Sequence, residues 1–125
     1  MKIHVQEYDG TNNCVRFDSE VGTAEAKWMG DLPDVGSDYY VEIAINKCLV
    51  WGDDIIATES LPHRITQSEV GITLEATLES IDSDGFAVIR LGITLVLIET
   101  EGTPPPVGTA VQVRLGELLL SDIGI

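Results

Sequence analysis

The stretch Gly30-Asp31-Leu32-Pro33-Asp34-Val35-Gly36 occurs twice in this chain, the second time in diverged form as Gly102-Thr103-Pro104-Pro105-Pro106-Val107-Gly108. Both copies fit the pattern G-x-x-P-x-V-G and lie 72 positions apart. Proline restricts the backbone φ angle and glycine permits left-handed angles, so each copy predicts a rigid loop that turns into a new strand. A loop motif repeated in this way indicates a duplicated β unit.

The segments around the two loops follow one another in the same order. Each loop leads into an alternating strand and then a short apolar strand, and a further strand precedes it (residues 39–45 with 111–115, 49–51 with 118–120, and 15–17 with 87–89). A single short β unit is marginally stable on its own. We therefore expect the two copies to pair their apolar faces in one core.

Apolar and polar residues alternate along most of the chain, most clearly in residues 72–79, where every second residue is apolar. This period of two is typical of half-buried strands, and turn-forming sequences separate the runs (residues 9–13, 52–54, 82–85 and 102–106). The sequence therefore predicts an all-β fold in which two diverged β repeats form a barrel-like or sandwich core.

The same pattern divides the chain into a first repeat, residues 1–60, and a second repeat, residues 71–125, within one compact domain. Residues 61–70 are expected to form a linker or a short helical turn, because they show no clear alternation.

The charge of the chain is strongly negative throughout. Its 21 Asp and Glu residues outnumber 7 Lys and Arg residues, and the net charge is -14. The excess is present in both halves, which excludes an acidic tail as its source. Such a surface repels nucleic acid and anionic membranes and attracts basic partners, so we expect neither DNA, RNA nor a membrane as a partner.

The termini and the cysteines favour a cytoplasmic protein. Residues 1–7 lack the hydrophobic run of a signal peptide, and no apolar stretch approaches the length that spans a bilayer. Cys14 and Cys48 lie in apolar, strand-like contexts without the spacing of a disulfide framework. We expect both thiols to be reduced and buried.

Three segments of the second repeat resemble the small barrels of the oligonucleotide/oligosaccharide-binding (OB) type. They are a strand, a D-G-F-A turn into a second strand, and a V-G-x-x-V-x-V strand (residues 74–81, 84–89 and 107–113), about a third of the chain. The resemblance implies barrel-like topology. It does not imply the usual activity, because binding of single strands requires a basic groove with aromatic platforms. This repeat offers only Arg90, Arg114 and Phe86.

No motif in the sequence indicates catalysis, a metal or a cofactor. Asp82-Ser83-Asp84-Gly85 begins like a calcium loop, but a strand follows directly, which favours a hairpin turn. The cysteines and histidines lack the paired spacing of zinc sites, and no glycine-rich loop precedes a helix. We therefore expect a protein that is not an enzyme.

The charge and the lack of chemical motifs favour a binding protein that neutralises a basic protein partner, such as a bacterial immunity or inhibitor protein against a nuclease-type toxin. The alternatives are an OB-like module for a ligand or nucleic acid, and a structural, oligomeric β subunit. The predicted contact residues lie in turns and on solvent faces: Tyr40, Glu42, Asp53, Asp54, Glu75 and Glu79. Alternation places Tyr40 on the same face as Glu42, as an aromatic anchor, whereas Trp28 and Trp51 are expected to anchor the core or, alternatively, to contribute one partner contact.

Overall fold

The computed structural model describes residues 1–124, which form twelve strands and no helix. The strands are β1 (Lys2–Asp9), β2 (Cys14–Ser19), β3 (Gly22–Met29), β4 (Asp38–Ala44), β5 (Leu49–Val50), β6 (Ile55–Ala57), β7 (Arg64–Ser68), β8 (Gly71–Ile81), β9 (Phe86–Leu91), β10 (Thr94–Glu101), β11 (Ala110–Leu115) and β12 (Leu119–Asp122). The prediction of an all-β fold is confirmed.

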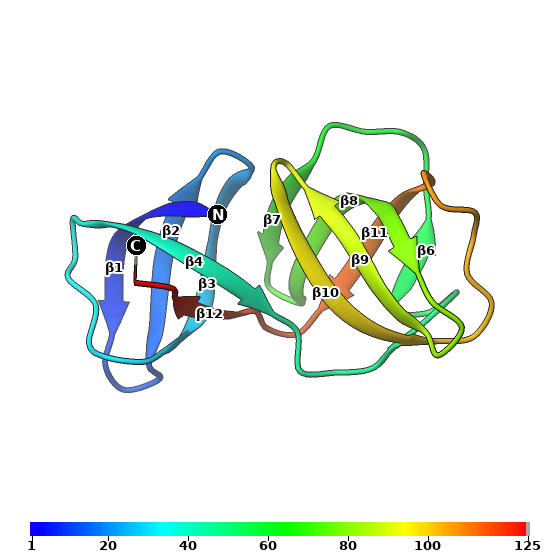
Figure 1. Cartoon of the computed structure of the whole chain (residues 1–125). Coiled ribbons are helices and arrows are strands. Elements are labelled where there is room, and N and C mark those ends of the chain that lie inside the picture. Colours follow the sequence, from blue (N-terminus) through cyan, green and yellow to red (C-terminus); the bar gives the residue numbers. More distant parts are fainter. Residues whose placement is uncertain (125) are drawn as a thin grey trace.

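The strands form two barrels that lie side by side (Figure 1). The first is a closed barrel in the order β1-β2-β3-β12-β4, with β4 returning to β1. The second has the order β5-β10-β9-β8-β11-β6 and is nearly closed by a bridge between Trp51 and Ile55. This architecture is compatible with the resemblance to small β-barrels.

Residues 61–70 were expected to form a linker or a short helical turn. The prediction of a helical turn is wrong, because residues 64–68 form strand β7. This strand pairs antiparallel with the first half of β8. Its Ile65 is buried, and the Ile65 N–H donates to the Val21 carbonyl oxygen at 2.7 Å. Contacts with both barrels therefore determine the conformation of this segment.

The two barrels repeat the same hydrogen bonds around the two proline-containing loops. The N–H of Gly36 donates to the carbonyl oxygen of Val5, and the N–H of Gly108 donates to that of Leu78, each at 2.8 Å. The φ angles of the two glycines are +91° and +94°, in the region that favours glycine. A register shift follows the acceptor in both cases, between Val5 and Glu7 and between Leu78 and Ser80. The internal repeat is thus present in the backbone geometry.

Each repeat contributes strands to the barrel of the other: β12 of the second repeat lies in the first barrel, and β5 and β6 of the first repeat lie in the second. Leu120 of β12 pairs in parallel with Trp28 of β3, and Leu49 of β5 pairs in parallel with Thr100 of β10. Trp28 and Thr100 are 72 positions apart, which is the offset of the repeat. The repeats and the barrels therefore have different boundaries, and the last strand of the chain closes the first barrel (Figure 1).

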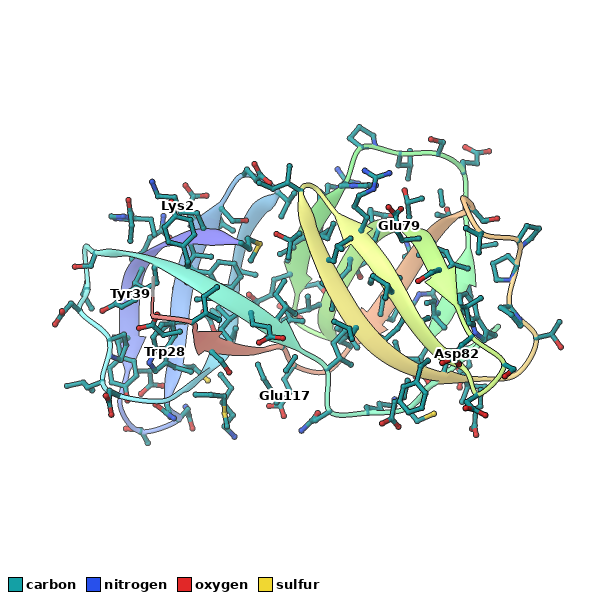
Figure 2. The ribbon with its side chains drawn as sticks, viewed as in Figure 1. Lys2, Trp28, Tyr39, Glu79, Asp82 and Glu117 are labelled. Carbon is teal, nitrogen blue, oxygen red and sulfur yellow. The ribbon has the colours of Figure 1, made fainter. Side chains whose placement is uncertain are left out.

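Inward-facing side chains fill both barrels. Trp28 and Phe17 are fully buried in the first barrel, and the Trp28 Nε1–H donates to the Asp31 carbonyl oxygen at 2.6 Å. The Trp28 ring meets the Tyr39 ring edge to face at a centroid distance of 5.1 Å, and Figure 2 labels both residues. Trp51 is half-buried and packs against the core. Both tryptophans therefore contribute to the core, as expected.

Candidate binding surface

The outer face of β9 and β10 carries large apolar side chains in solvent. On β10, Val96 and Ile98 point into the barrel, whereas Leu95 and Leu97 point outward and are 53% and 68% exposed. Phe86 on β9 is 55% exposed and lies opposite Glu99. The apolar run of residues 93–98 indicated a strand. Only the barrel structure determines which of its side chains point inward and which are exposed to solvent.

A hollow of about 500 Å³ lies on this face. Its apolar lining comes from β8, β9, β10 and the segment after β4, and two carboxylates stand among these side chains (Ile45, Ile81, Phe86, Ala87, Val88, Leu97, Ile98, Asp82 and Glu99, with Ser80). We call this the β9–β10 hollow. Asp82 is held in place, because its Oδ1 accepts the N–H groups of Asp84 and Phe86 at 2.8 and 3.0 Å. The interpretation of residues 82–85 as a hairpin turn is confirmed.

A second hollow, of about 310 Å³, lies where the two barrels meet. It is lined by Lys2, Ile3, His4, Asp18, Glu20, Asp38 and Ile93, and we call it the interbarrel hollow. Asp38 accepts a hydrogen bond from His4 Nδ1 at 2.7 Å and lies 3.7 Å from Lys2 Nζ. The bond from His4, and then the charge of Lys2, lower the pKa of Asp38. Lys2 and His4 are therefore both engaged by Asp38, whereas Asp18 and Glu20 have no ion pair within residues 1–124.

Tyr40 and Glu42, two of the predicted contact residues, lie exposed on β4. Tyr40 is the cross-strand neighbour of Lys2, which lines the interbarrel hollow, and Glu42 lies opposite Ser121. The structure thus places the predicted aromatic anchor next to the hollow between the barrels.

Asp53 and Asp54 lie in the turn between β5 and β6 but differ in their surroundings. Asp53 is exposed, whereas the Asp54 side chain is only 14% exposed. Lys47 Nζ donates to Asp54 at 2.8 Å and the Val50 N–H donates to it at 3.0 Å, and these bonds lower the pKa of the Asp54 carboxyl. Asp54 therefore holds the turn together, and Asp53 is the carboxylate free to meet a partner.

The expectation that Glu75 faces solvent is wrong, because its side chain is 5% exposed. Alternation places Glu75 on the outside of β8, but β7 and β11 pair with β8 on both sides of this position. Its Oε1 accepts a hydrogen bond from Gln112 Nε2 at 3.1 Å, and its Oε2 is buried without a partner among the described residues. Glu79 is exposed as expected and forms an ion pair with Arg90 at 3.3 Å (labelled in Figure 2).

The six predicted residues lie on both barrels, and no hydrogen bond or ion pair described for residues 1–124 joins any two of them. Sequence reasoning missed Phe86, Leu95, Leu97 and Ile93 as surface residues. The available signal was the uninterrupted apolar run of residues 93–98, which lacks the polar alternation of a half-buried strand.

The cysteines are both free thiols. Cys14 is half-buried, but Cys48 is exposed, so the expectation of a buried Cys48 is wrong. Loss of solvent around the thiol, and then the carboxylates of Glu101 and Glu99, raise the pKa of Cys48. A raised pKa disfavours the reactive thiolate. Within the part of the chain that the structure describes, no group of three or more His, Cys, Asp or Glu side chains is arranged to hold a metal ion.

Comparisons with known proteins add no relative: no family model, no curated protein and no solved structure matches this chain. The described residues also contain no helix with the length and apolar character needed to cross a membrane. The site is therefore interpreted from its own geometry.

Proposed function

We propose that this protein binds and neutralises a basic protein partner in the cytoplasm, as an immunity or inhibitor protein against a nuclease-type toxin would. The observation that supports this function is the combination of an exposed apolar face on β9 and β10 with carboxylates that no cation of the chain neutralises. Only four of the 21 carboxylates take part in an ion pair with a described cation, namely Glu25, Asp38, Asp54 and Glu79.

The two components have different physical roles. Carboxylates around the contact attract a cationic partner over a distance of about 10 Å at 0.1 M salt and raise the rate of association. Exposed apolar side chains at the centre give up water on binding and lengthen the lifetime of the complex. A nuclease carries a cationic surface to match the phosphates of its substrate, and a surface with the opposite charge is complementary to it.

The experiment is co-purification from the native host, followed by binding kinetics at two ionic strengths. We expect a basic partner whose association slows steeply as salt is added. Glu99→Gln, at the rim of the β9–β10 hollow, should lower the association rate. Glu59→Gln removes the same charge from an exposed residue that lines neither hollow, and it serves as the matched control. Recovery of no basic partner, or an association rate that ignores salt, would contradict the proposal.

A small-ligand module of the OB type is the second candidate. The observation that favours it is the position of the larger hollow, on β9 and β10. These are the second and third strands of the second repeat, after β8, and OB-type barrels bind ligands on their second and third strands. Titration with single-stranded DNA and with oligosaccharides distinguishes the two functions, because only the ligand module predicts saturable binding.

A structural, oligomeric β subunit is the third candidate, and the exposed apolar side chains of β10 favour it. Light scattering over a range of concentrations tests this function directly.

A further inference from the structure

Strand β10 has a strand partner on only one side along most of its length. It pairs with β9 over residues 94–99, whereas β5 pairs only with Thr100 and Glu101. The Thr100 N–H points toward β9, where it donates to the Gly85 carbonyl oxygen at 2.8 Å. Successive residues of a strand point their backbone groups to opposite sides, so Leu95 and Leu97 direct theirs away from β9. No hydrogen bond described for residues 1–124 satisfies these groups.

The equivalent edge of the first barrel is covered. Val21, just before β3, and Glu25, within β3, lie 72 positions before Ile93 and Leu97. The Val21 carbonyl oxygen accepts the N–H of Ile65 at 2.7 Å, and the Glu25 N–H donates to Gln67 Oε1 at 2.6 Å. Strand β7 therefore lies along β3, whereas no described strand pairs with β10 over residues 94–99 on the side away from β9. Strand β4 comes close to β10 without pairing with it. At the start of the β10 edge, a single side-chain oxygen of Glu20 lies 3.5 Å from the Ile93 nitrogen.

The open edge connects the two hollows. Ile93 lines the interbarrel hollow, Leu97 lines the β9–β10 hollow, and Leu95 lies between them. With a rise of about 3.3 Å per residue, this stretch is about 13 Å long. All three side chains are more than half exposed. An extended segment of four or five residues along β10 would reach from one hollow to the other.

We propose that an extended segment of the basic partner docks along this edge as an additional strand, in the place that β7 occupies at β3. Backbone hydrogen bonds to Leu95 and Leu97 would provide the pairing, as in other complexes formed by strand addition. Thr94 stands where β3 has Gly22, whose missing side chain admits the Ile65 carbonyl oxygen, so pairing begins at Leu95.

We expect this segment to be cationic because carboxylates lie at both ends of the edge. This expectation also rests on the proposed function. Asp18 and Glu20 line the interbarrel hollow, and Asp82 and Glu99 line the β9–β10 hollow. Lys2 and His4 also line the interbarrel hollow, but both contact Asp38. A second copy of this chain is a poor occupant of the edge, because each copy carries a net charge of -14.

The test uses the full-length protein and a blocked eight-residue peptide of alternating arginine and valine. Amide hydrogen exchange, followed by NMR, should show slower exchange at Leu95 and Leu97 when the peptide is bound. A peptide of alternating threonine and valine is the uncharged control. Unchanged exchange at both amides with bound peptide, or no binding at millimolar peptide, would overturn the proposal.

Two substitutions at one position separate edge pairing from side-chain contact. Leu97→Ala and Leu97→Pro both remove the exposed side chain, but only proline removes the outward N–H, and proline is tolerated at strand edges. Leu97→Pro should weaken peptide binding by roughly fivefold to tenfold more than Leu97→Ala, the effect of about one lost hydrogen bond. Equal effects of the two variants would overturn edge pairing. If either variant fails to fold, amide exchange in the wild-type protein with bound peptide still tests the proposal.

The outcomes distinguish this inference from the proposed function. Salt-dependent peptide binding that leaves the two amides unprotected would refute docking on β10 and leave the acidic-surface function standing. If the uncharged peptide slows exchange at the two amides equally, the edge site is supported. The site then no longer supports a basic partner. If the protein self-associates and this protects both amides, the occupant of the edge is a second copy of the chain, which would overturn the proposal.

Discussion

Leu120 and Trp28 lie side by side in adjacent parallel strands of the first barrel, although most of the chain separates them. The corresponding pair in the second barrel is Leu49 with Thr100. The second repeat therefore supplies β12 to the first barrel, and the first repeat supplies β5 and β6 to the second. Neither barrel is made from one contiguous segment of the chain.

The exchange of strands predicts cooperative unfolding of the two barrels. Leu120 is fully buried, and Leu120→Ala should lower the free energy of unfolding by about 2 to 5 kcal/mol, the usual cost of a large-to-small change in a core. Urea unfolding of single-tryptophan variants measures the effect, because Trp28 lies in the first barrel and Trp51 closes the second.

In Leu120→Ala, the unfolding transitions reported by Trp28 and by Trp51 should both move to lower urea concentration, and by the same amount. The control is Ile123→Ala, at the first residue after β12, where the side chain is exposed. A shift of the Trp28 transition alone would show that the barrels unfold independently.

Glycine at position 85 is required for a close approach as well as for its φ angle. Gly85 and Gly108 have φ angles of +88° and +94°, so alanine at either position should cost about 1 kcal/mol of stability. At Gly85 the added Cβ would also collide with the Thr100 carbonyl oxygen, whereas nothing lies near it at Gly108. Thermal unfolding should therefore show a larger loss for Gly85→Ala, by roughly 1 to 3 kcal/mol. Equal losses would contradict the described contact.

Asp54 predicts a pH dependence of stability at acidic pH. Its pKa is lowered in the folded protein, first by the Lys47 hydrogen bond and then by the Val50 N–H. Its ionised form therefore stabilises the fold above the usual pKa of 3.8, and this contribution is lost as the pH falls through the folded-state pKa. Asp54→Asn should flatten the decline of stability below about pH 4 in acid-unfolding curves. Asp53→Asn, the control at the adjacent exposed carboxylate, should leave the curve unchanged.

Cys48 should react slowly for an exposed thiol. Partial loss of solvent and the carboxylates of Glu101 and Glu99 raise its pKa above the usual 9.0, which leaves little thiolate at pH 8. Alkylation followed by mass spectrometry should show slower modification than that of a small free thiol. Glu101→Gln should speed the reaction, whereas Glu59→Gln should not. Rapid modification of the wild-type protein would contradict the raised pKa.

Tyr40 should influence the lifetime of a complex with the basic partner. Its exposed ring lies next to the interbarrel hollow, so Tyr40→Ala should raise the dissociation rate by an amount that corresponds to about 2 kcal/mol. Glu42→Gln, on the same face, should mainly lower the association rate. Surface-based kinetics with the co-purified partner measures both rates. A Tyr40→Ala variant that binds like the wild type would place the contact elsewhere.

Some parts of the candidate surface were predictable from local sequence and others were not. Alternation correctly placed Tyr40, Glu42 and Glu79 in solvent, because each strand position has only two faces. It failed for Glu75, which is buried between its cross-strand neighbours Arg64 on β7 and Gln112 on β11. It also gave no orientation for Leu95 and Leu97, because a continuous apolar run has no polar face.

The sequence by itself determined that the chain is all-β, that it contains two related repeats, and that its surface is acidic. These features depend on the period of the apolar residues, on glycines and prolines at turns, and on the number of charges, all of which are local properties. Only the tertiary structure decided which strand closes which barrel, because β5 and β12 are short apolar segments of similar character. It also decided that β7 covers β3 while β10 keeps an open edge, since such pairing depends on which strands long-range packing brings together.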